Sequence, residues 1–314
     1  MEIIHTPVLL QETLKYLSPV GEPFENDCFM VDSTLGEGGH SEAFLSSFKN
    51  LRIIGLDADS KIQARAKERL APFGDRMNFY NGWFNDFYAN YPENLPKPDL
   101  ILFDLGISVF HYERSGRGFS FRYDEPLDMR LNPNAGESVE SLVNTKREEE
   151  LANIIFNYGE ERYSRRIARA IVEHRKMSRI VSSKVLADII YGAVPAQYRH
   201  GNIHPATKSF QAFRIAVNGE LDRLPLALEN AFKNLKPGGK LGVITFHSLE
   251  DRIVKNMFKD WAKKCTCPPE QPICNCGGKP KAELILRKPV GPTDSEVVEN
   301  SPSRSAKLRV LRKL

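Results

Sequence analysis

The chain lacks any apolar run long enough to cross a membrane as a helix, although 41% of its 314 residues are hydrophobic. Near Met1 it also lacks the basic region and apolar core of a secretory signal, so we expect a cytoplasmic protein. Cysteine is scarce, with five residues in the whole sequence. In a protein without a secretory signal, this scarcity argues against a fold held together by disulfides.

One missing glycine narrows the choice of cofactor. Residues 31–41 read VDSTLGEGGHS and place Gly36, Gly38 and Gly39 after an apolar strand. The dinucleotide fingerprint G-x-G-x-x-G requires a third glycine where this chain has Ser41. The serine weakens the case for a nicotinamide cofactor, whereas a cofactor with an adenosine and an amino-acid carboxylate, such as S-adenosylmethionine, fits this turn equally well. A βαβ unit with a glycine turn and no ligand is the remaining alternative.

Around this turn, the sequence predicts strands that are followed by chemically useful side chains. Asp57 ends the second strand, where a carboxylate can accept hydrogen bonds from both ribose hydroxyls of an adenosine. Phe84 follows the third strand and is our candidate for a wall of the adenine site. Asp104 follows an apolar run typical of a strand buried on both faces, so its carboxylate can face both cofactor and substrate. The predicted strands span residues 28–33, 52–56, 77–80 and 98–103.

The strand–helix alternation then stops until about Lys208. A long structureless insert is uncommon in a compact domain, so we interpret the amphipathic stretches here as an inserted helical subdomain. The predicted helices of this insert span residues 147–158, 163–177 and 182–193.

The remaining elements complete an α/β fold class. Thr6 and Pro7 predict the cap and first residue of a helix before the sheet. We expect the helical region 210–235 to break near Pro225, and Ser248 to cap the next helix, with an acid three residues later. A fifth strand is predicted within residues 235–247. The closing strands are predicted at 281–288 and 307–312, where they can form an antiparallel hairpin with a long connection. The result is a seven-stranded sheet with an inserted α-helical subdomain, divided as residues 1–111, 112–208 and 209–314.

The net charge of +4 is small but unevenly distributed. Residues 160–184 contain eight Lys and Arg against three acids, and residues 279–314 contain nine against four. Two basic segments on a nearly neutral chain suggest a polyanionic partner, although ordinary solvated faces have the same composition. The candidates for phosphate contacts are Arg117, Arg162, Arg165, Arg166, Lys208, Arg214 and Arg252.

Four cysteines form a C-x-C-x6-C-x-C cluster at Cys265, Cys267, Cys274 and Cys276. Four thiolates can bind a structural zinc ion, but zinc fingers usually space their cysteines as C-x2-C. Structural zinc and reduced thiols in a loop therefore both remain open, and we assign no metal ligand.

A series of short motifs spans the whole chain. In order they are HTPVLL (5–10), GEGGHS (36–41), DLGIS (104–108), RGFSF (117–121), PLDMR (126–130), YGEER (158–162), IARAI (167–171), HPATKSFQAFRI (204–215), FHSLEDRIVK (246–255) and NSPSRSAKLRV (300–310). In these motifs the chain resembles the bacterial small-subunit ribosomal RNA cytosine-N4 methyltransferases of the MraW type. GEGGHS alone would be weak, but its combination with RGFSF, PLDMR, HPATK and FHSLEDR is highly specific.

The resemblance implies a class I S-adenosylmethionine-dependent methyltransferase with a Rossmann-like sheet. It implies methylation of the exocyclic N4 amine of a cytidine in the decoding region of small-subunit ribosomal RNA, with S-adenosylmethionine as cofactor. The assembled small subunit is the expected form of the substrate, no membrane is involved, and a homodimer remains open.

The resemblance also implies a set of site residues. His111 stands where the family has a cofactor-contacting glutamine, which is a departure from the pattern. Asp104 is the best-placed acceptor for the amine protons, because of its strand position, and we assign it the catalytic role. The family's cofactor positions map onto Gly38, Gly39, His40, Asp57, Phe84, Asp104 and His111.

Three other functions remain as alternatives. A nicotinamide-dependent oxidoreductase is disfavoured by Ser41. A DNA amino-methyltransferase is disfavoured because residues 104–107 read DLGI and lack that class's double proline. An RNA-binding ribosome-assembly factor with a vestigial cofactor pocket is disfavoured by the retained Asp57 and Asp104, although His111 leaves some room for it.

Overall fold

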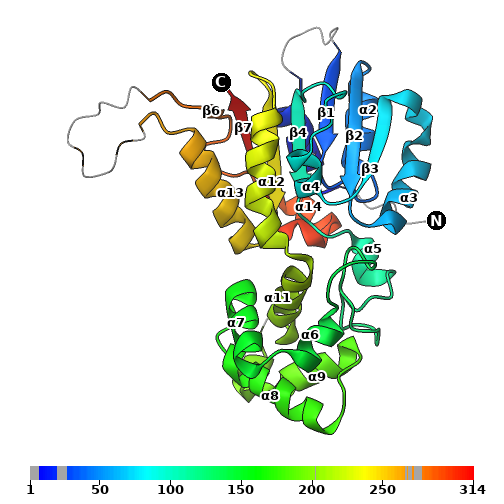
Figure 1. Ribbon diagram of the computed structural model, residues 1–314, viewed down its shortest axis with the longest axis vertical. Coiled ribbons are helices and arrows are strands. Elements are labelled where there is room, and N and C mark those ends of the chain that lie inside the picture. The colour runs from blue at the N-terminus through cyan, green and yellow to red at the C-terminus, as the bar shows by residue number, and fades with distance from the viewer. Residues whose placement is uncertain (1–6, 20–26, 202, 266, 268–270, 272–277) are drawn as a thin grey trace. The chain divides into compact units, whose positions relative to one another are not determined.

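The computed structural model describes residues 7–19, 27–201, 203–265, 267, 271 and 278–314 (Figure 1). The chain forms two compact units. One comprises Met1–Ile107 with Asp222–Leu314, and the other is Ser108–Leu221. No helix in the described part of the chain is both long and apolar enough to span a membrane.

The first unit is built on one seven-stranded sheet with the order β3-β2-β1-β4-β5-β7-β6. Five strands run parallel, and β7 is antiparallel to both of its neighbours. The sheet confirms the predicted strand number and the terminal antiparallel pair. The strands are β1 (Cys28–Asp32), β2 (Leu51–Asp57), β3 (Met77–Asn81), β4 (Leu100–Asp104), β5 (Lys240–Thr245), β6 (Ala282–Leu284) and β7 (Lys307–Lys313).

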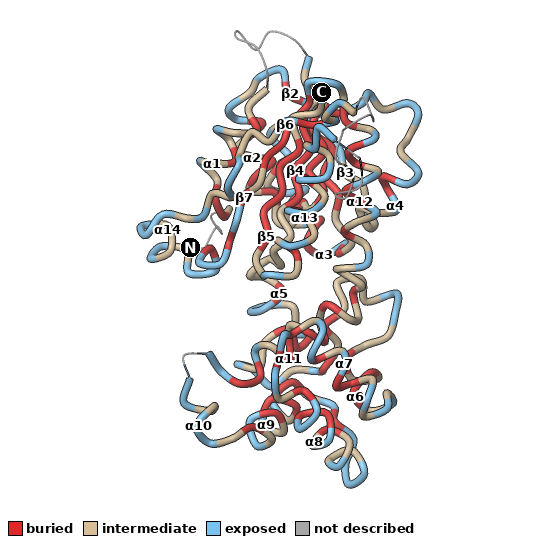
Figure 2. The backbone as a smooth tube through the Cα atoms, turned by 90° about the vertical axis from the view of Figure 1, so that its left-hand side faces the viewer, coloured by how far each residue is buried: buried red, intermediate tan, exposed pale blue. Residues whose placement is uncertain are grey.

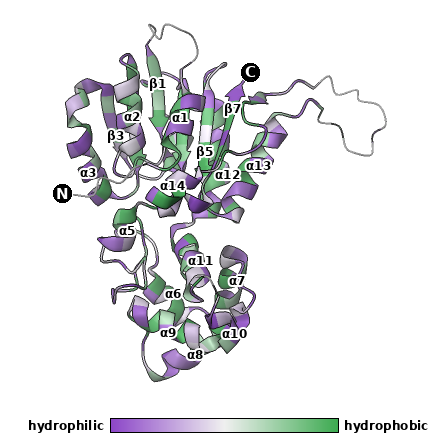
Figure 3. Ribbon diagram, turned by 180° about the vertical axis from the view of Figure 1, so that it is seen from behind, coloured by the Kyte–Doolittle hydropathy of each residue, from purple (hydrophilic) through white to green (hydrophobic). Residues whose placement is uncertain are grey.

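Helices cover both faces of this sheet. They are α1 (Leu10–Leu17), α2 (Gly39–Ser47), α3 (Ser60–Leu70), α4 (Phe84–Ala89), α12 (Glu220–Asn234), α13 (Ser248–Trp261) and α14 (Asp294–Glu299), with 3-10 turns at Ala71–Arg76 and Ser301–Ser305. Figure 2 shows the central strands β4 and β5 as mostly buried, and β1 is strongly hydrophobic (Figure 3).

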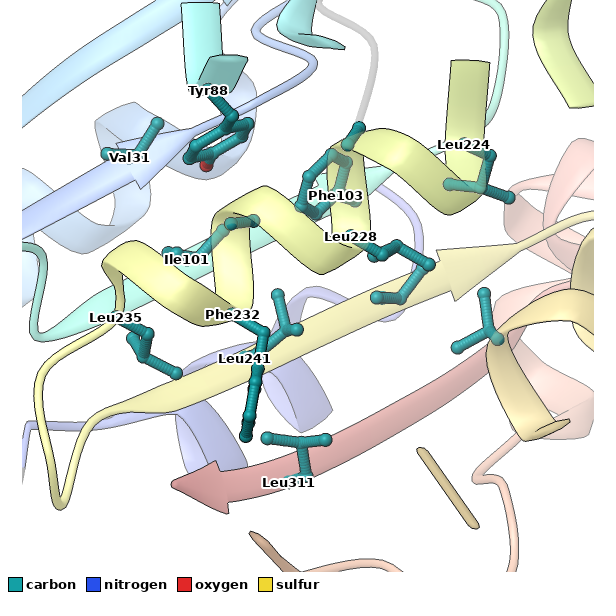
Figure 4. Close-up of a cluster of buried hydrophobic side chains, with 14 of the residues drawn as sticks. Val31, Tyr88, Ile101, Phe103, Leu224, Leu228, Phe232, Leu235, Leu241 and Leu311 are labelled. Atoms are coloured by element: carbon teal, nitrogen blue, oxygen red, sulfur yellow. The ribbon is translucent and has the colours of Figure 1, made fainter. Parts of the chain in front are cut away.

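The pleat of β4 explains how one strand supplies two cores. Ile101 and Phe103 pack with side chains of α4, α12 and α13 in one hydrophobic cluster (Figure 4). Leu100 and Leu102 join a second cluster with side chains of α1, α2 and α3. Successive strand residues point to opposite faces, so a near-continuous apolar run is what a strand covered on both sides requires. Each such side chain contributes about 1.5–3 kcal/mol on full burial, so both clusters stabilise β4 in the middle of the sheet.

The second unit is helical. Its elements are α5 (Val109–Glu113), α6 (Val139–Thr145), α7 (Glu148–Gly159), α8 (Ser164–Met177), α9 (Ser183–Ala193), α10 (Ala196–Arg199) and α11 (Ala206–Asn218). The predicted Ser182 cap of α9 is confirmed, because its side chain accepts a hydrogen bond from the Val185 N–H. The short helices α5, α6 and α10 were not predicted.

Close packing of α11 on α7 places α11 in the helical unit. A Cβ on Gly159 would lie 2.6 Å from the Lys208 carbonyl oxygen and 3.3 Å from the Ala212 Cβ. Only glycine allows the two backbones to approach this closely. Helix α11 therefore belongs to the helical unit, whereas our division at residues 208 and 209 placed most of it with the third segment. The structure also begins this unit at Ser108 rather than at residue 112.

Two predicted helix boundaries were wrong. The break in the long helical region falls at Gly219, whose φ of 60° ends α11, and Pro225 lies inside α12. The first helix begins at Leu10 rather than Pro7, because Leu9 adopts a φ of 53° and donates its N–H to Glu296 Oε1 at 2.7 Å. The proposed Thr6 cap lies outside the described residues.

The cap of α13 lies one residue earlier than predicted. His247, not Ser248, precedes the helix in an extended conformation. Its ring accepts from the Glu250 N–H at 3.4 Å, while Glu250 Oε2 accepts from the His247 N–H at 3.3 Å. This reciprocal pair is a capping box, displaced by one position from the one predicted. The strand expected at 281–288 is likewise shortened to β6.

Candidate active site

Three carboxylates lie at the carboxyl ends of adjacent parallel strands. Asp32 ends β1, Asp57 ends β2 and Asp104 ends β4. The strand order reverses here, because β2 and β3 lie on one side of β1 whereas β4 and β5 lie on the other. In open α/β sheets, such a switch point is where ligands bind.

The turn between β1 and α2 depends on glycine for both conformation and packing. Gly38 has a φ of 81°, and a Cβ there would lie 2.8 Å from Leu70 Cδ1. A Cβ on Gly39 would lie 2.5 Å from Pro7 Cγ. Part of the glycine requirement is therefore structural, since these two residues approach protein side chains closely. The N-terminal amides of α2 remain a suitable site for an anionic group such as a carboxylate.

Asp57 is held by the backbone on both sides. Its Oδ2 accepts from the Gly36 N–H at 2.9 Å, and its Oδ1 accepts from the Asp59 N–H at 2.8 Å. A carboxylate has about four lone-pair positions, so these bonds leave capacity for ribose hydroxyls. Burial raises the pKa of Asp57 to about 7, against the opposing effect of the two backbone hydrogen bonds.

This pKa predicts a pH dependence of cofactor binding. The group is protonated below about pH 7 and ionised above it, and the ionised form is the better acceptor for two hydroxyl donors. If the ligand binds only the ionised form, its affinity rises about tenfold from about pH 6 to pH 8. Calorimetric titration with S-adenosylmethionine in wild type and Asp57→Asn measures this. Asp57→Asn should bind S-adenosylmethionine more weakly, and its affinity should not rise between about pH 6 and pH 8. An equal rise of affinity with pH in both proteins would contradict the prediction.

Asp104 lies beside the glycine turn and beside α2. Its backbone N–H donates to Thr34 Oγ1 at 2.6 Å, and its Oδ1 accepts from the Gly106 N–H at 3.3 Å. Its Oδ2 lies 3.3 Å from His40 Nε2. Thus the three hydrophilic groups that surround Asp104 come from the end of β1, the start of α2 and the residues after β4.

Sequence reasoning missed the roles of Asp32, Thr34 and Ser41. Asp32 is buried, and its Oδ2 accepts from Ser41 Oγ at 2.7 Å. Burial raises the Asp32 pKa, while the bond from Ser41 and the nearby His40 lower it. All three residues lie in the VDSTLGEGGHS segment. Their position in this motif is the sequence signal that could have identified them. Ser41, which replaces the third glycine, thus hydrogen-bonds an acid at the sheet edge.

Phe84 lies where the sequence placed it, after β3 at the start of α4. Its ring is partly buried and packs edge-on against Phe103, with centroids 5.5 Å apart. This contact ties Phe84 to β4, the strand that carries Asp104. Its role as a wall of the adenine site remains a prediction.

The structure places His111 and Arg117 in the helical unit. His111 is buried in α5, with its ring 5.2 Å from that of Phe119. Arg117 is also buried, and its Nη1 donates to the carbonyls of Arg130 and Leu131 at 2.8 and 3.1 Å. The buried guanidinium does not favour a phosphate contact, because it holds two loop segments together. The cofactor role of His111 remains a prediction.

We therefore expect Arg117→Met to destabilise the protein rather than to weaken RNA binding directly. Two hydrogen bonds from a charged donor are lost, which corresponds to about 2–4 kcal/mol of unfolding free energy. Denaturant unfolding measures the effect. The control is Arg122→Met, at an exposed arginine nearby, which should leave stability within about 0.5 kcal/mol. A stable Arg117→Met protein with weakened RNA binding would restore the phosphate-contact assignment.

The other candidate cations divide into exposed and engaged groups. Arg162, Arg165 and Arg166 are exposed at or just before the start of α8, and Arg252 is exposed on α13. By contrast, the Arg214 side chain is 11% exposed and forms a double hydrogen bond with Glu220 at 2.8 and 2.9 Å. That pairing neutralises Arg214 and makes a phosphate contact unfavourable. Half-buried Lys208 donates to the Glu160 carbonyl at 3.3 Å.

Arg162 is the best organised of the exposed cations. Its guanidinium lies over the rings of Tyr163 and Tyr198, at 4.8 and 5.0 Å from their centroids. Buried Glu161 fixes this platform, because it accepts from the Tyr163 N–H at 2.8 Å and from the Tyr198 hydroxyl at 2.6 Å. No ion pair of Arg165 or Arg166 is present within the described residues.

Two cysteines of the predicted cluster lie within the described residues. Cys265 is exposed and Cys267 is half-buried, and the Cys267 N–H donates to Cys265 Sγ at 3.4 Å. Cys274 and Cys276 lie outside the described residues. Structural zinc and reduced thiols therefore both stay open.

The acidic edge suits a cationic cofactor. The ionised carboxylates of Asp57 and Asp104 oppose a pyrophosphate, but complement the sulfonium and ammonium groups of S-adenosylmethionine. Asp57 also offers a carboxylate for the ribose. A sheet of this order, with this turn and edge, defines a class I S-adenosylmethionine-dependent methyltransferase.

Comparison with known proteins agrees with that class. The chain belongs to the MraW methylase family, whose profile matches residues 2–314. The predicted family, fold class and cofactor are thereby confirmed.

Individual relatives match over nearly their full length. A ribosomal RNA small subunit methyltransferase H from Treponema denticola is 60% identical over 314 residues, covering 100% of this chain and 98% of the relative. The protein of the same name from Treponema pallidum is 43% identical, covering 99% and 93%. Among solved structures, a putative rRNA-methylase from Clostridium thermocellum matches with a TM-score of 0.44 and 13% identity, covering 99% of this chain and 100% of that one.

Proposed function

We propose that this protein methylates the exocyclic N4 amine of a cytidine in the decoding region of small-subunit ribosomal RNA. The observation that carries the proposal is family membership across the whole chain, joined to a carboxylate, Asp104, at the cofactor edge of the sheet. The relatives' names state small-subunit ribosomal RNA as their substrate. The N4 position rests on the motif resemblance and on the chemistry of Asp104.

The chemistry requires an acceptor for the amine protons. The lone pair of a cytosine amine is delocalised into the ring and is a poor nucleophile. When bound, S-adenosylmethionine supplies a methyl group whose bond to sulfur breaks, with the electron pair left on sulfur, as the N4 lone pair bonds to carbon. Asp104 accepts a hydrogen bond from N4–H, which localises that lone pair. It then takes the N4 proton and releases it to water, so the product leaves neutral.

The other residues hold the reactants. Asp57 binds the ribose, Gly38, Gly39 and His40 shape the turn for the cofactor's amino-acid part, and Phe84 lines the adenine. Orientation of the two reactants can supply roughly 7–11 kcal/mol of the barrier. His111 remains assigned to the cofactor through the family pattern.

We assign the RNA contact of the helical unit to the exposed arginines at the start of α8. Arg162, Arg165 and Arg166 form a cationic surface on or beside a tyrosine platform, and such a surface suits an RNA backbone. Arg252 and Lys208 stay as weaker candidates, while Arg117 and Arg214 are removed. The assembled small subunit is the proposed substrate form, and action there would place the protein in the cytoplasm.

A direct product assay tests the proposal. Purified protein is incubated with isotope-labelled S-adenosylmethionine and small subunits from cells that lack it, and the RNA is digested to nucleosides. Labelled N4-methylcytidine on mass spectrometry is the expected result. Tight cofactor binding without any labelled nucleoside would favour the assembly-factor alternative, and a different labelled nucleoside would overturn the N4 assignment.

A further inference from the structure

His40 has an environment that the cofactor turn alone does not explain. It is the second residue of α2 and is 6% exposed. Neither ring nitrogen forms a hydrogen bond within the described structure. A buried polar atom without a hydrogen bond costs about 1–3 kcal/mol. The protein therefore retains a costly imidazole at the edge where the reactants are proposed to bind.

The imidazole lies behind the reactive carboxylate. His40 Nε2 is 3.3 Å from Asp104 Oδ2, which is close enough for an ion pair but outside hydrogen-bond geometry. The His40 side chain is 7% exposed, whereas that of Asp104 is 20% exposed. A reactant can therefore reach Asp104 more readily than His40. In apo structures, catalytic hydrogen bonds are often poorly aligned and tighten in the reactive complex.

The Asp104 carboxylate needs a second constraint. Its other oxygen, Oδ1, accepts a long hydrogen bond of 3.3 Å from the Gly106 N–H. The Asp104 backbone is firmly placed through Thr34 Oγ1 at 2.6 Å, but this bond does not fix the side-chain torsions. A donor on Oδ2 would set the plane of the carboxylate and direct the remaining lone pairs.

Neighbouring groups keep the imidazole in place. Asp32 is the second acid with an electrostatic interaction with His40, and its carboxylate is anchored by Ser41 Oγ. Ser41 directly follows His40 on α2. The Asp32–Ser41 bond thus pins the first turn of the helix that carries the imidazole.

We propose that His40 is a positioning residue for methyl transfer, whose Nε2–H donates to Asp104 Oδ2 and orients the carboxylate toward the substrate amine. This inference rests on the proposed function and adds a side-chain role for a residue that the proposed function uses to shape the turn. His40 touches neither proton nor methyl group in this scheme. Its effect passes through Asp104.

Two variants of matched size isolate the donor. His40→Gln places an amide N–H at a reach similar to that of Nε2, whereas His40→Met has a similar unbranched shape without a donor. We expect His40→Met to lower kcat about 10- to 100-fold, because misplacement of a reacting group by about 1 Å costs a factor of this order. His40→Gln should stay within about fivefold of wild type. The cofactor Kd and the KM for small subunits should differ less than about threefold between the two variants, because both keep the backbone of the turn.

A double-mutant cycle separates positioning from a structural role. In an Asp104→Asn background, His40→Met should lower kcat by less than about twofold further, because the group it orients has already been lost. Additive losses, or equal losses in the Gln and Met variants, would overturn the proposal, as would unchanged kcat in His40→Met. If His40→Met does not bind the cofactor, the test rests on His40→Gln. The proposal is then overturned if His40→Gln binds the cofactor with a normal Kd but has a kcat more than about tenfold below that of wild type.

The product made by the wild-type protein separates a failure of the proposed function from a failure of the positioning role of His40. If wild type labels a nucleoside other than N4-methylcytidine, the proposed function fails, and the Gln–Met comparison is still read on that product. If wild type makes N4-methylcytidine and the two variants behave alike, the positioning role alone fails.

Discussion

Asp104→Asn is expected to lower kcat about 10²- to 10³-fold, which is the usual loss when one electrostatic contact to the transition state is removed. The amide has no negative charge to stabilise the developing cation at N4 and cannot take its proton. Cofactor Kd should rise less than about fivefold, because Asp57 and the turn residues are unchanged. Single-turnover methylation and calorimetric binding measure the two quantities separately.

The matched control for this substitution is Asp86→Asn, at an exposed acid on α4 of the same unit. Wild-type turnover is expected there. If Asp104→Asn keeps near-normal turnover with full cofactor affinity, Asp104 is not the acceptor. If it loses cofactor affinity while kcat holds at saturating cofactor, Asp104 only binds the cofactor.

Reversing the charge of Arg165 and Arg166 together should weaken binding to small subunits about 10- to 100-fold at physiological salt. Two attractive contacts with phosphates become two repulsive ones. The slope of log affinity against log salt concentration should therefore become less steep by about two. The cofactor Kd should not change, since the arginines lie in the other unit. Filter binding across a salt series measures both quantities.

A charge-matched pair of substitutions controls for net charge. Lys61→Glu with Lys67→Glu makes the same change on exposed positions of α3, in the sheet unit. This control should affect subunit binding much less. Equal losses in the two double variants would show a general charge effect and would remove the assignment of RNA contacts to α8.

The sheet could be predicted because its strands are local apolar runs. Residues 98–103 are apolar at nearly every position, as a strand covered on both faces requires. Asp57 and Asp104 end β2 and β4, and they share one edge of the sheet because parallel strands all present the same end there. The positions of Asp57 and Asp104 therefore followed from strand boundaries alone.

Helix boundaries that depend on the hydrogen bonds or the backbone conformation of a single residue were harder to predict. Ser248 was mistaken for the cap because Asp251 follows it by three residues, just as Glu250 follows His247. Pro225 was expected to break the helix, but the φ of Gly219 does so first. At the start of α13, two adjacent residues carried the same local signal, and only the hydrogen bonds between His247 and Glu250 show which of them is the cap.

The amino-acid sequence by itself determined the α/β class, the glycine turn, the acids at the strand ends and the family. Each of these four features can be recognised from short contiguous motifs. Only the tertiary structure decided which charged groups are available. Arg117 and Arg214 look like Arg165 and Arg166 in sequence, yet Arg117 is buried against backbone carbonyls and Arg214 is paired with an acid. Likewise, only folding brings His40 to within 3.3 Å of a carboxylate that follows it by 64 residues. Burial and pairing depend on how the folded chain places each side chain, which the composition of a short motif does not encode.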